Sequence, residues 1–226
     1  MANLAYRLSN WAFRRVLTCF AHWQVEGGEN VPPFGPLIVA SNHLSNLDPP
    51  LLAVSIPRRL RFVAKRTLFR WGLGVFLRAY GAYPVDRDGA DAPAMLWALR
   101  LLQRDGTLVV FPEGHRNPRG GMRRGQPGLA LLAIKSHAPI LPVGITGTEH
   151  LGPLWRVAFP TGRIRVRIGQ PFTLPLAQGR VSREQLQALT DMVMERIALL
   201  LPPPYRGVYG VGPRPPAGRE GAPLLS

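Results

Sequence analysis

Cysteine and lysine are nearly absent from this chain of 226 residues, and each scarcity narrows its chemistry. Cys19 is the one cysteine, so no disulfide can form within the chain, a cysteine metal centre is excluded, and a reducing compartment suits the protein. The only lysines are Lys65 and Lys135. Arginine therefore carries almost all of the positive charge. Arginine is the side chain suited to bidentate contact with phosphate, although a GC-rich genome produces the same bias.

Long apolar runs are also missing. No run reaches the ~20 residues that a membrane-spanning helix needs. Arg14 and Arg15 interrupt the early apolar segment, so we expect no cleavable secretory signal. The length suits one domain with a substantial core. The formal net charge of +15 calls for a polyanionic partner, and nucleic acid and anionic lipid are the two candidates.

The first 23 residues follow a helical pattern with one narrow polar stripe. The stripe consists of Asn3, Arg7, Asn10 and Arg14, and the remaining arc is wide and mostly apolar. This pattern is typical of an interfacial helix, in which Trp11 and Trp23 would lie at headgroup depth and the arginines would meet lipid phosphates. A helix that packs on its own domain has the same pattern, so both interpretations stay open.

Short apolar stretches rich in β-branched residues alternate with helical patterns between residues 36 and 145. The predicted strands are 36–40, 61–64, 81–87, 107–111 and 140–145. This alternation predicts a single α/β domain with a mostly parallel central sheet flanked by helices. We place this domain at residues 25–201, after an N-terminal amphipathic, membrane-associating helix at 1–24 and before a flexible tail, rich in Pro and Gly, at 202–226.

Two later segments have clear local patterns. Residues 163–168 alternate strictly between arginine and an aliphatic residue, which predicts a strand with one basic face. We interpret it as an edge strand whose arginines protect its free edge, although a membrane-facing arginine row has the same pattern. Ser182 and Gln185 have the spacing of a capping box and predict the start of a closing amphipathic helix.

Pairs of polar residues follow three of the predicted strands. The pairs are His43 with Asp48, Asp86 with Arg87, and Glu113 with Arg116. Ligands of open α/β sheets bind beyond the carboxyl ends of the strands, so the three pairs should meet in one cleft. An aspartate that orients the imidazole of His43 would make it a general base. The alternative is a loop histidine beside an aspartate that only caps the next helix.

These residues, in this order, resemble the four motifs of the phospholipid/glycerol acyltransferases. The motifs are Asn42-His43 with Asp48, Gly81 through Asp86-Arg87, Phe111-Pro112-Glu113-Gly114-His115-Arg116, and Ile140-Leu141-Pro142-Val143. Four ordered motifs are far more specific than any one of them alone, and the resemblance covers about residues 20–200. Within the family, the short chain resembles the bacterial members that acylate lysophosphatidic acid.

The resemblance implies a role for each matching residue. His43 would take the proton from the acceptor hydroxyl as it attacks the thioester carbonyl, while Asp48 would fix the imidazole tautomer. Arg87 and Arg116 would hold the acceptor phosphate. Lys65 matches a position also associated with that phosphate, and Glu113 and Gly114 would shape the loop. Asn42 would help to order the loop of the dyad. Ser45 lacks the strand-turn-helix context of a nucleophile elbow and is not expected to be a nucleophile.

The function implied is transfer of a fatty acyl group from acyl-CoA or acyl carrier protein to lysophosphatidic acid, which gives phosphatidic acid for phospholipid synthesis. No cofactor or metal is expected. The expected partners are the bilayer and its anionic lipids, and the expected location is peripheral or monotopic on the cytoplasmic face of the cell membrane.

Two alternatives remain open. The first keeps the chemistry but uses another lysophospholipid, glycerol 3-phosphate or a lyso-ornithine-type lipid. His115 raises this question because it stands where the third motif usually has a small hydroxyl residue. The second is a non-catalytic basic protein that binds membrane or nucleic acid. Aromatic residues are not interleaved with the basic ones as a stacking platform and no nucleic-acid motif is present, so we expect no nucleic-acid partner.

Overall fold

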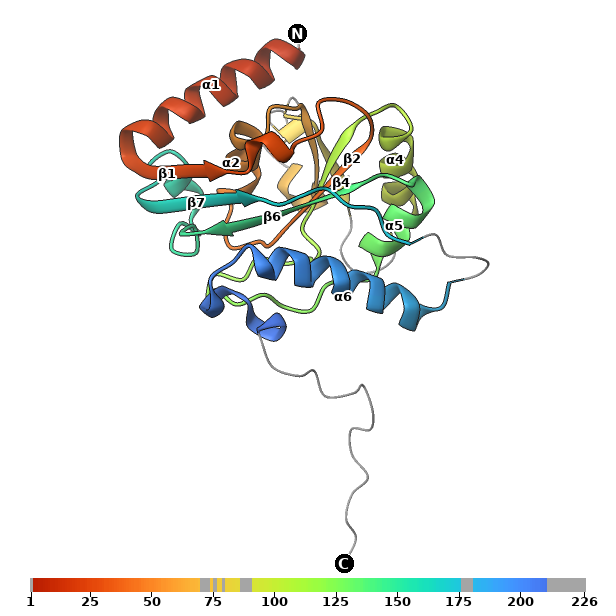
Figure 1. The fold of residues 1–226 in the computed structure, drawn as a ribbon. Helices are drawn as coiled ribbons and strands as arrows, with labels where there is room; N and C mark the ends of the chain where they lie inside the picture. Colours follow the sequence, from red (N-terminus) through yellow and green to blue (C-terminus); the bar gives the residue numbers. More distant parts are fainter. Residues whose placement is uncertain are drawn as a thin grey trace, which may run out of the picture.

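The computed structural model describes residues 2–69, 74, 77–78, 80–85, 91–175 and 181–210. Within these ranges, seven strands form one sheet in the order β1-β7-β6-β2-β5-β3-β4 (Figure 1). Their bounds are β1 Ala21–Glu26, β2 Leu37–Ser41, β3 Leu60–Lys65, β4 Ala82–Val85, β5 Thr107–Val110, β6 Ile140–Thr146 and β7 Gly162–Ile168.

Neighbouring strands pair in parallel throughout, except for the antiparallel pair β6 and β7. The predicted α/β domain with a mostly parallel sheet is therefore confirmed. All five residues of β2 are buried, because this central strand pairs with β5 and β6 and is covered on both faces of the sheet.

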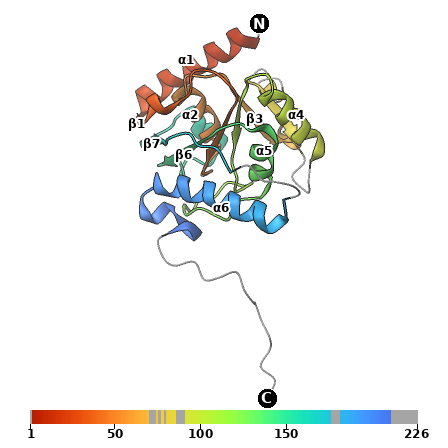
Figure 2. The same cartoon turned by 45° about the vertical axis from the view of Figure 1, so that its right-hand side comes forward.

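Helices cover the two faces of the sheet (Figures 1 and 2). The helices are α1 Ala2–Phe20, α2 Asp48–Ser55, α4 Ala92–Leu102, α5 Gly128–Ser136 and α6 Arg183–Leu199, with short 3-10 turns η1 Gly28–Asn30, η2 Arg66–Phe69, η3 Leu154–Val157, η4 Pro203–Tyr205 and η5 Gly207–Tyr209. Side chains of α1 and α2 pack into one apolar core, and those of α4, α5 and α6 pack into another. The sheet therefore separates two helical layers.

Helix α1 packs against the domain through the buried Tyr6 and Leu17 and through Asn10, and it leaves another apolar face outside. The Asn10 amide donates to the carbonyl of Ala53 at 3.1 Å and accepts from the hydroxyl of Tyr80 at 2.8 Å. On the opposite side, Leu4, Leu8 and Trp11 are 61%, 56% and 61% exposed. The helix also ends at Phe20, so the expected boundary near residue 24 is wrong and the following residues form β1.

Strand β7 has the predicted alternation, with buried aliphatic residues between its arginines. The interpretation of β7 as an edge strand is wrong, because β1 pairs with residues 162–167 of β7. The Nε of Arg167 donates to Glu26 of β1 at 2.8 Å, and the Nε of Arg165 lies 3.5 Å from the same carboxylate. The arginine row is therefore partly neutralised by a neighbouring strand.

Part of the expected tail packs against the domain. Tyr209 is buried, and its hydroxyl donates to Asp191 at 2.7 Å and accepts from the amide of Gly125 at 3.1 Å. The flexible tail therefore does not begin at residue 202, and residues 211–226 lie outside the described part of the chain. The capping box of Ser182 and Gln185 is present at the start of α6.

None of the described helices is long and apolar enough to cross a membrane.

Candidate active site

His43 and Asp48 form a contact at the carboxyl end of the central strand. His43 lies two residues after β2, and Asp48 is the first residue of α2. The Nδ1 of His43 is 2.8 Å from Oδ2 of Asp48, and both side chains are buried. Because the carboxylate accepts, we assign the proton to Nδ1, which leaves the lone pair on Nε2. The turn between the two residues therefore produces the geometry of an oriented base.

Asp48 is held by donors on both of its oxygens. Oδ2 also accepts from the backbone amides of Leu44 at 2.6 Å and Ser45 at 2.8 Å, and Oδ1 accepts from the hydroxyl of Thr148 at 2.7 Å. Asp48 is fully buried, and these donors compensate the loss of water around its charge. The carboxylate therefore organises the loop and the imidazole, which is more than a helix cap does.

The loop after β5 packs against the histidine. The backbone amide of His43 donates to Oε1 of Glu113 at 3.0 Å, and the His43 carbonyl accepts from the amide of Asn117 at 2.7 Å. The imidazole also stacks on the ring of Phe111, with 4.0 Å between the ring centres and 18° between the planes. The loop after β5, a strand that neighbours β2, therefore holds His43 in position.

Glu113 joins the loop that carries His43 to the segment around Arg123, farther along the chain. Its second oxygen, Oε2, accepts from the backbone amide of Arg123 at 2.9 Å. Burial raises the pKa of the Glu113 carboxyl, and the two amide hydrogen bonds oppose that shift. Gly114 forms the adjacent turn with φ of +72°, a conformation in which any side chain would be strained. Glu113 and Gly114 were predicted to shape this loop for the substrate, and that role stays a prediction.

The structure describes two of the three predicted phosphate ligands. Lys65 ends β3 and is exposed, and the sheet order separates its strand from that of His43 by β5. Two inter-strand spacings correspond to about 10 Å across the sheet. Arg116 is exposed in the loop after β5. Arg87 and its neighbour Asp86 lie outside the described residues, so the phosphate clamp predicted from Arg87 and Arg116 remains a prediction.

Sequence reasoning missed part of the support around the dyad. Thr148 is fully buried and comes from the loop after β6, which lies on the other side of β2 from β5. Thr148 could have been identified from the sequence, because it is a polar residue that follows the predicted strand 140–145, just as His43 and Glu113 follow theirs. Asn42 was expected to order the loop, and its amide exchanges two hydrogen bonds with the backbone of Ile145, at 2.9 and 2.7 Å.

The described residues contain no group of three or more His, Cys, Asp or Glu side chains that could hold a metal ion.

The fold and the site together define an α/β protein with an aspartate-oriented histidine at the carboxyl edge of its sheet. A family model described as Acyltransferase matches residues 22–146, more than half of the chain. The chain therefore belongs to this acyltransferase family and to its class of enzymes.

Several relatives are named for the same activity. The chain is 27% identical to 1-acyl-sn-glycerol-3-phosphate acyltransferase of Bacillus subtilis (strain 168) over 196 residues, which cover 85% of this chain and 94% of that protein. It is 32% identical to 1-acyl-sn-glycerol-3-phosphate acyltransferase alpha of Homo sapiens over 174 residues, which cover 75% of this chain and 60% of the human protein.

Among solved structures, the 1-acyl-sn-glycerophosphate (LPA) acyltransferase of Thermotoga maritima is similar to this chain, with a TM-score of 0.66 and 29% identity. The match covers 84% of this chain and 77% of that chain. The match covers a smaller share of the mammalian relatives, namely 53% of 1-acyl-sn-glycerol-3-phosphate acyltransferase alpha of Bos taurus and 60% of the human protein.

Proposed function

We propose that this protein transfers a fatty acyl group from a thioester, carried by acyl-CoA or acyl carrier protein, to the free hydroxyl of lysophosphatidic acid. The observation that carries the proposal is the 2.8 Å contact between Nδ1 of His43 and the buried carboxylate of Asp48. The activity named for the relatives of Bacillus subtilis and Thermotoga maritima supports lysophosphatidic acid as the acceptor.

The chemistry needs one positioned base. Nε2 of His43 removes the proton of the acceptor hydroxyl while its oxygen attacks the thioester carbonyl. The carbon–oxygen bond forms, the carbon–sulfur bond breaks, and the imidazolium returns the proton to the leaving thiolate. Asp48 stabilises that imidazolium. A thioester is an activated donor, so no covalent enzyme intermediate is required, and general base catalysis contributes about 10²–10⁴-fold.

The rest of the rate enhancement comes from placing the hydroxyl against the carbonyl. We assign the acceptor phosphate to Arg116, Lys65 and Arg87. Arginine forks suit this task because they form two parallel hydrogen bonds to phosphate. Lys65, the last residue of β3, and Arg116, in the loop after β5, are both exposed at the same edge of the sheet as His43, which supports the assignment.

The acceptor is a membrane lipid, so the enzyme needs to work at a bilayer surface. The exposed apolar face of α1, with Leu4, Leu8 and Trp11, supports peripheral attachment of this helix in the interface. We place the enzyme on the cytoplasmic face because its thioester donors are carried there.

The test is an acceptor panel with one radiolabelled acyl thioester. Lysophosphatidic acid should be acylated in preference to other lysophospholipids, glycerol 3-phosphate and a lyso-ornithine lipid. His43→Ala, purified in parallel, provides the blank. A preference for another acceptor would overturn the substrate assignment while keeping the reaction, and activity equal to that of the His43→Ala blank would overturn the proposal.

A further inference from the structure

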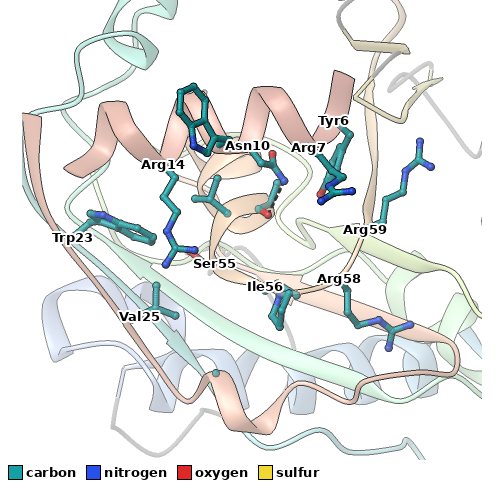
Figure 3. Close-up of a pocket in the computed structure, with 15 residues that line it drawn as sticks. Tyr6, Arg7, Asn10, Arg14, Trp23, Val25, Ser55, Ile56, Arg58 and Arg59 are labelled. Carbon is teal, nitrogen blue, oxygen red and sulfur yellow. Dashed lines mark hydrogen bonds between the residues drawn. The ribbon is translucent and has the colours of Figure 1, made fainter. Parts of the chain in front are cut away.

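A groove of about 900 Å³ lies between α1 and the body of the domain (Figure 3). It is bordered by α1, by β1 and by the C-terminal end of α2 with the residues that follow it. The dyad lies at the other end of α2, which has 8 residues and is about 12 Å long. The groove is therefore a separate site from the one that contains His43.

The groove is lined by positively charged side chains. Its charged lining residues are Arg7, Arg14, Arg58 and Arg59, and no aspartate or glutamate lines it. Arg58 is already engaged, because it donates to the backbone carbonyls of Pro32, Phe34, Gly35 and Asp105. Within the described ranges, no carboxylate pairs with Arg7 or Arg14. Two guanidinium groups of α1 are therefore available to an anion.

The remaining lining is largely apolar and aromatic. Val25, Val54 and Ile56 line the groove between β1 and α2. The guanidinium of Arg14 lies 5.7 Å from the ring centre of Trp23 and points into this space (Figure 3). A ligand that fills this groove needs an anionic group for the arginines and an apolar part that covers these walls. A molecule with both parts is an amphiphile.

The groove is continuous with the exposed apolar face of α1. Trp11 lines the groove and also belongs to the face formed with Leu4 and Leu8. If that face lies in the interface of a bilayer, Arg7 and Arg14 on its flank are at the depth of the lipid phosphates. This continuity favours the bilayer as the source of the amphiphile.

We propose that the groove binds one anionic phospholipid of the bilayer. Its phosphate lies between Arg7 and Arg14, which are seven residues apart and separated by about 10 Å along the helix axis. One acyl chain lies along Val25, Val54 and Ile56. Such a lipid would fix α1 to the domain while the outer face of the helix is embedded. The site is distinct from the acceptor site and does not depend on the reaction proposed above.

The test measures binding of dihexanoylphosphatidylglycerol, below its critical micelle concentration, to the full chain by titration calorimetry. This lipid is anionic but is neither the proposed acceptor nor its product. The Arg7→Gln/Arg14→Gln variant should bind it at least tenfold more weakly. The matched control is Arg100→Gln/Arg104→Gln, which removes the same charge from exposed positions at the end of α4 and should bind within twofold of the unchanged protein.

Two further ligands separate the possible sources of binding. Dihexanoylphosphatidylcholine should bind more weakly, because its headgroup is not anionic overall, and inorganic phosphate should bind more weakly still. Equal binding of the choline lipid, or phosphate binding as tight as that of the glycerol lipid, would overturn the proposal. So would unchanged binding by Arg7→Gln/Arg14→Gln. A second variant, Val54→Phe, narrows the apolar part and should weaken lipid binding without changing phosphate binding; circular dichroism checks the fold of each variant.

Discussion

The hydroxyl of Thr148 offers a sharp test of how the dyad is held. Thr148→Val keeps the size and branching of the side chain but removes the 2.7 Å hydrogen bond to Oδ1 of Asp48. Ser45 Oγ, at 3.4 Å from the same oxygen, is a weak replacement. Loss of a hydrogen bond to a buried charged group costs about 1.5–3 kcal/mol of unfolding free energy. For a chain of this size the melting temperature should fall by about 3–12 °C.

The catalytic part of this prediction separates positioning from stability. With Oδ1 less firmly held, Asp48 no longer fixes the imidazole in one orientation, so kcat should fall while the acceptor KM changes little. Thr148→Ser keeps the hydroxyl and should recover both kcat and most of the melting temperature. Calorimetry and initial-rate kinetics on the three proteins provide the measurements. A Thr148→Val protein that melts and turns over like the unchanged enzyme would refute the argument that this hydrogen bond orients the dyad.

The other predictions concern the base, the buried glutamate, the clamp and the helix face. His43→Ala should abolish acyl transfer while circular dichroism shows the fold intact, and full turnover would contradict the base assignment. Burial raises the pKa of Glu113 above 4.5, the ordinary value for a glutamate. The unchanged protein should therefore lose stability as the pH rises from 4.5 through the raised pKa, and Glu113→Gln should remove this pH dependence. Melting curves across that range check this, and parallel curves would refute it. Arg116→Ala should lower kcat/KM for the acceptor, whereas an effect confined to the thioester donor argues against a phosphate role. Leu8→Asp should reduce cosedimentation of the protein with anionic vesicles more than the surface control Leu199→Asp does. Equal losses would show that the apolar face of α1 does not contribute to membrane binding.

The central site was predictable because its residues follow strands in the sequence. His43, Asp48 and Glu113 were identified from a rule about strand ends, and the structure brings these three together. The rule required only the order of strands and loops, which local sequence patterns contain. It did not require knowledge of which strands are neighbours in the sheet.

The features that sequence reasoning missed depend on long-range pairing. The position of β7 inside the sheet depends on β1, a strand that follows directly after a helix and was not predicted. The direction of α1 is another case, because the hydrophobic pattern of a helix does not say which face meets the domain. Here the contacts of Asn10 with Ala53 and Tyr80 decide it, and both partners are far away in the sequence.

The sheet order explains why the base stands on β2. This strand lies between β5 and β6, so its carboxyl end is flanked by two loops rather than one. The loop after β5 supplies an acceptor for the His43 amide through Glu113, and the loop after β6 supplies the Thr148 donor to Asp48. A base on an edge strand would have one such neighbour and would keep more freedom of motion. The central position therefore lets two independent loops hold the histidine and the aspartate in place. Arg116, in the loop after β5, and Lys65, at the end of β3, are exposed at the same edge of the sheet.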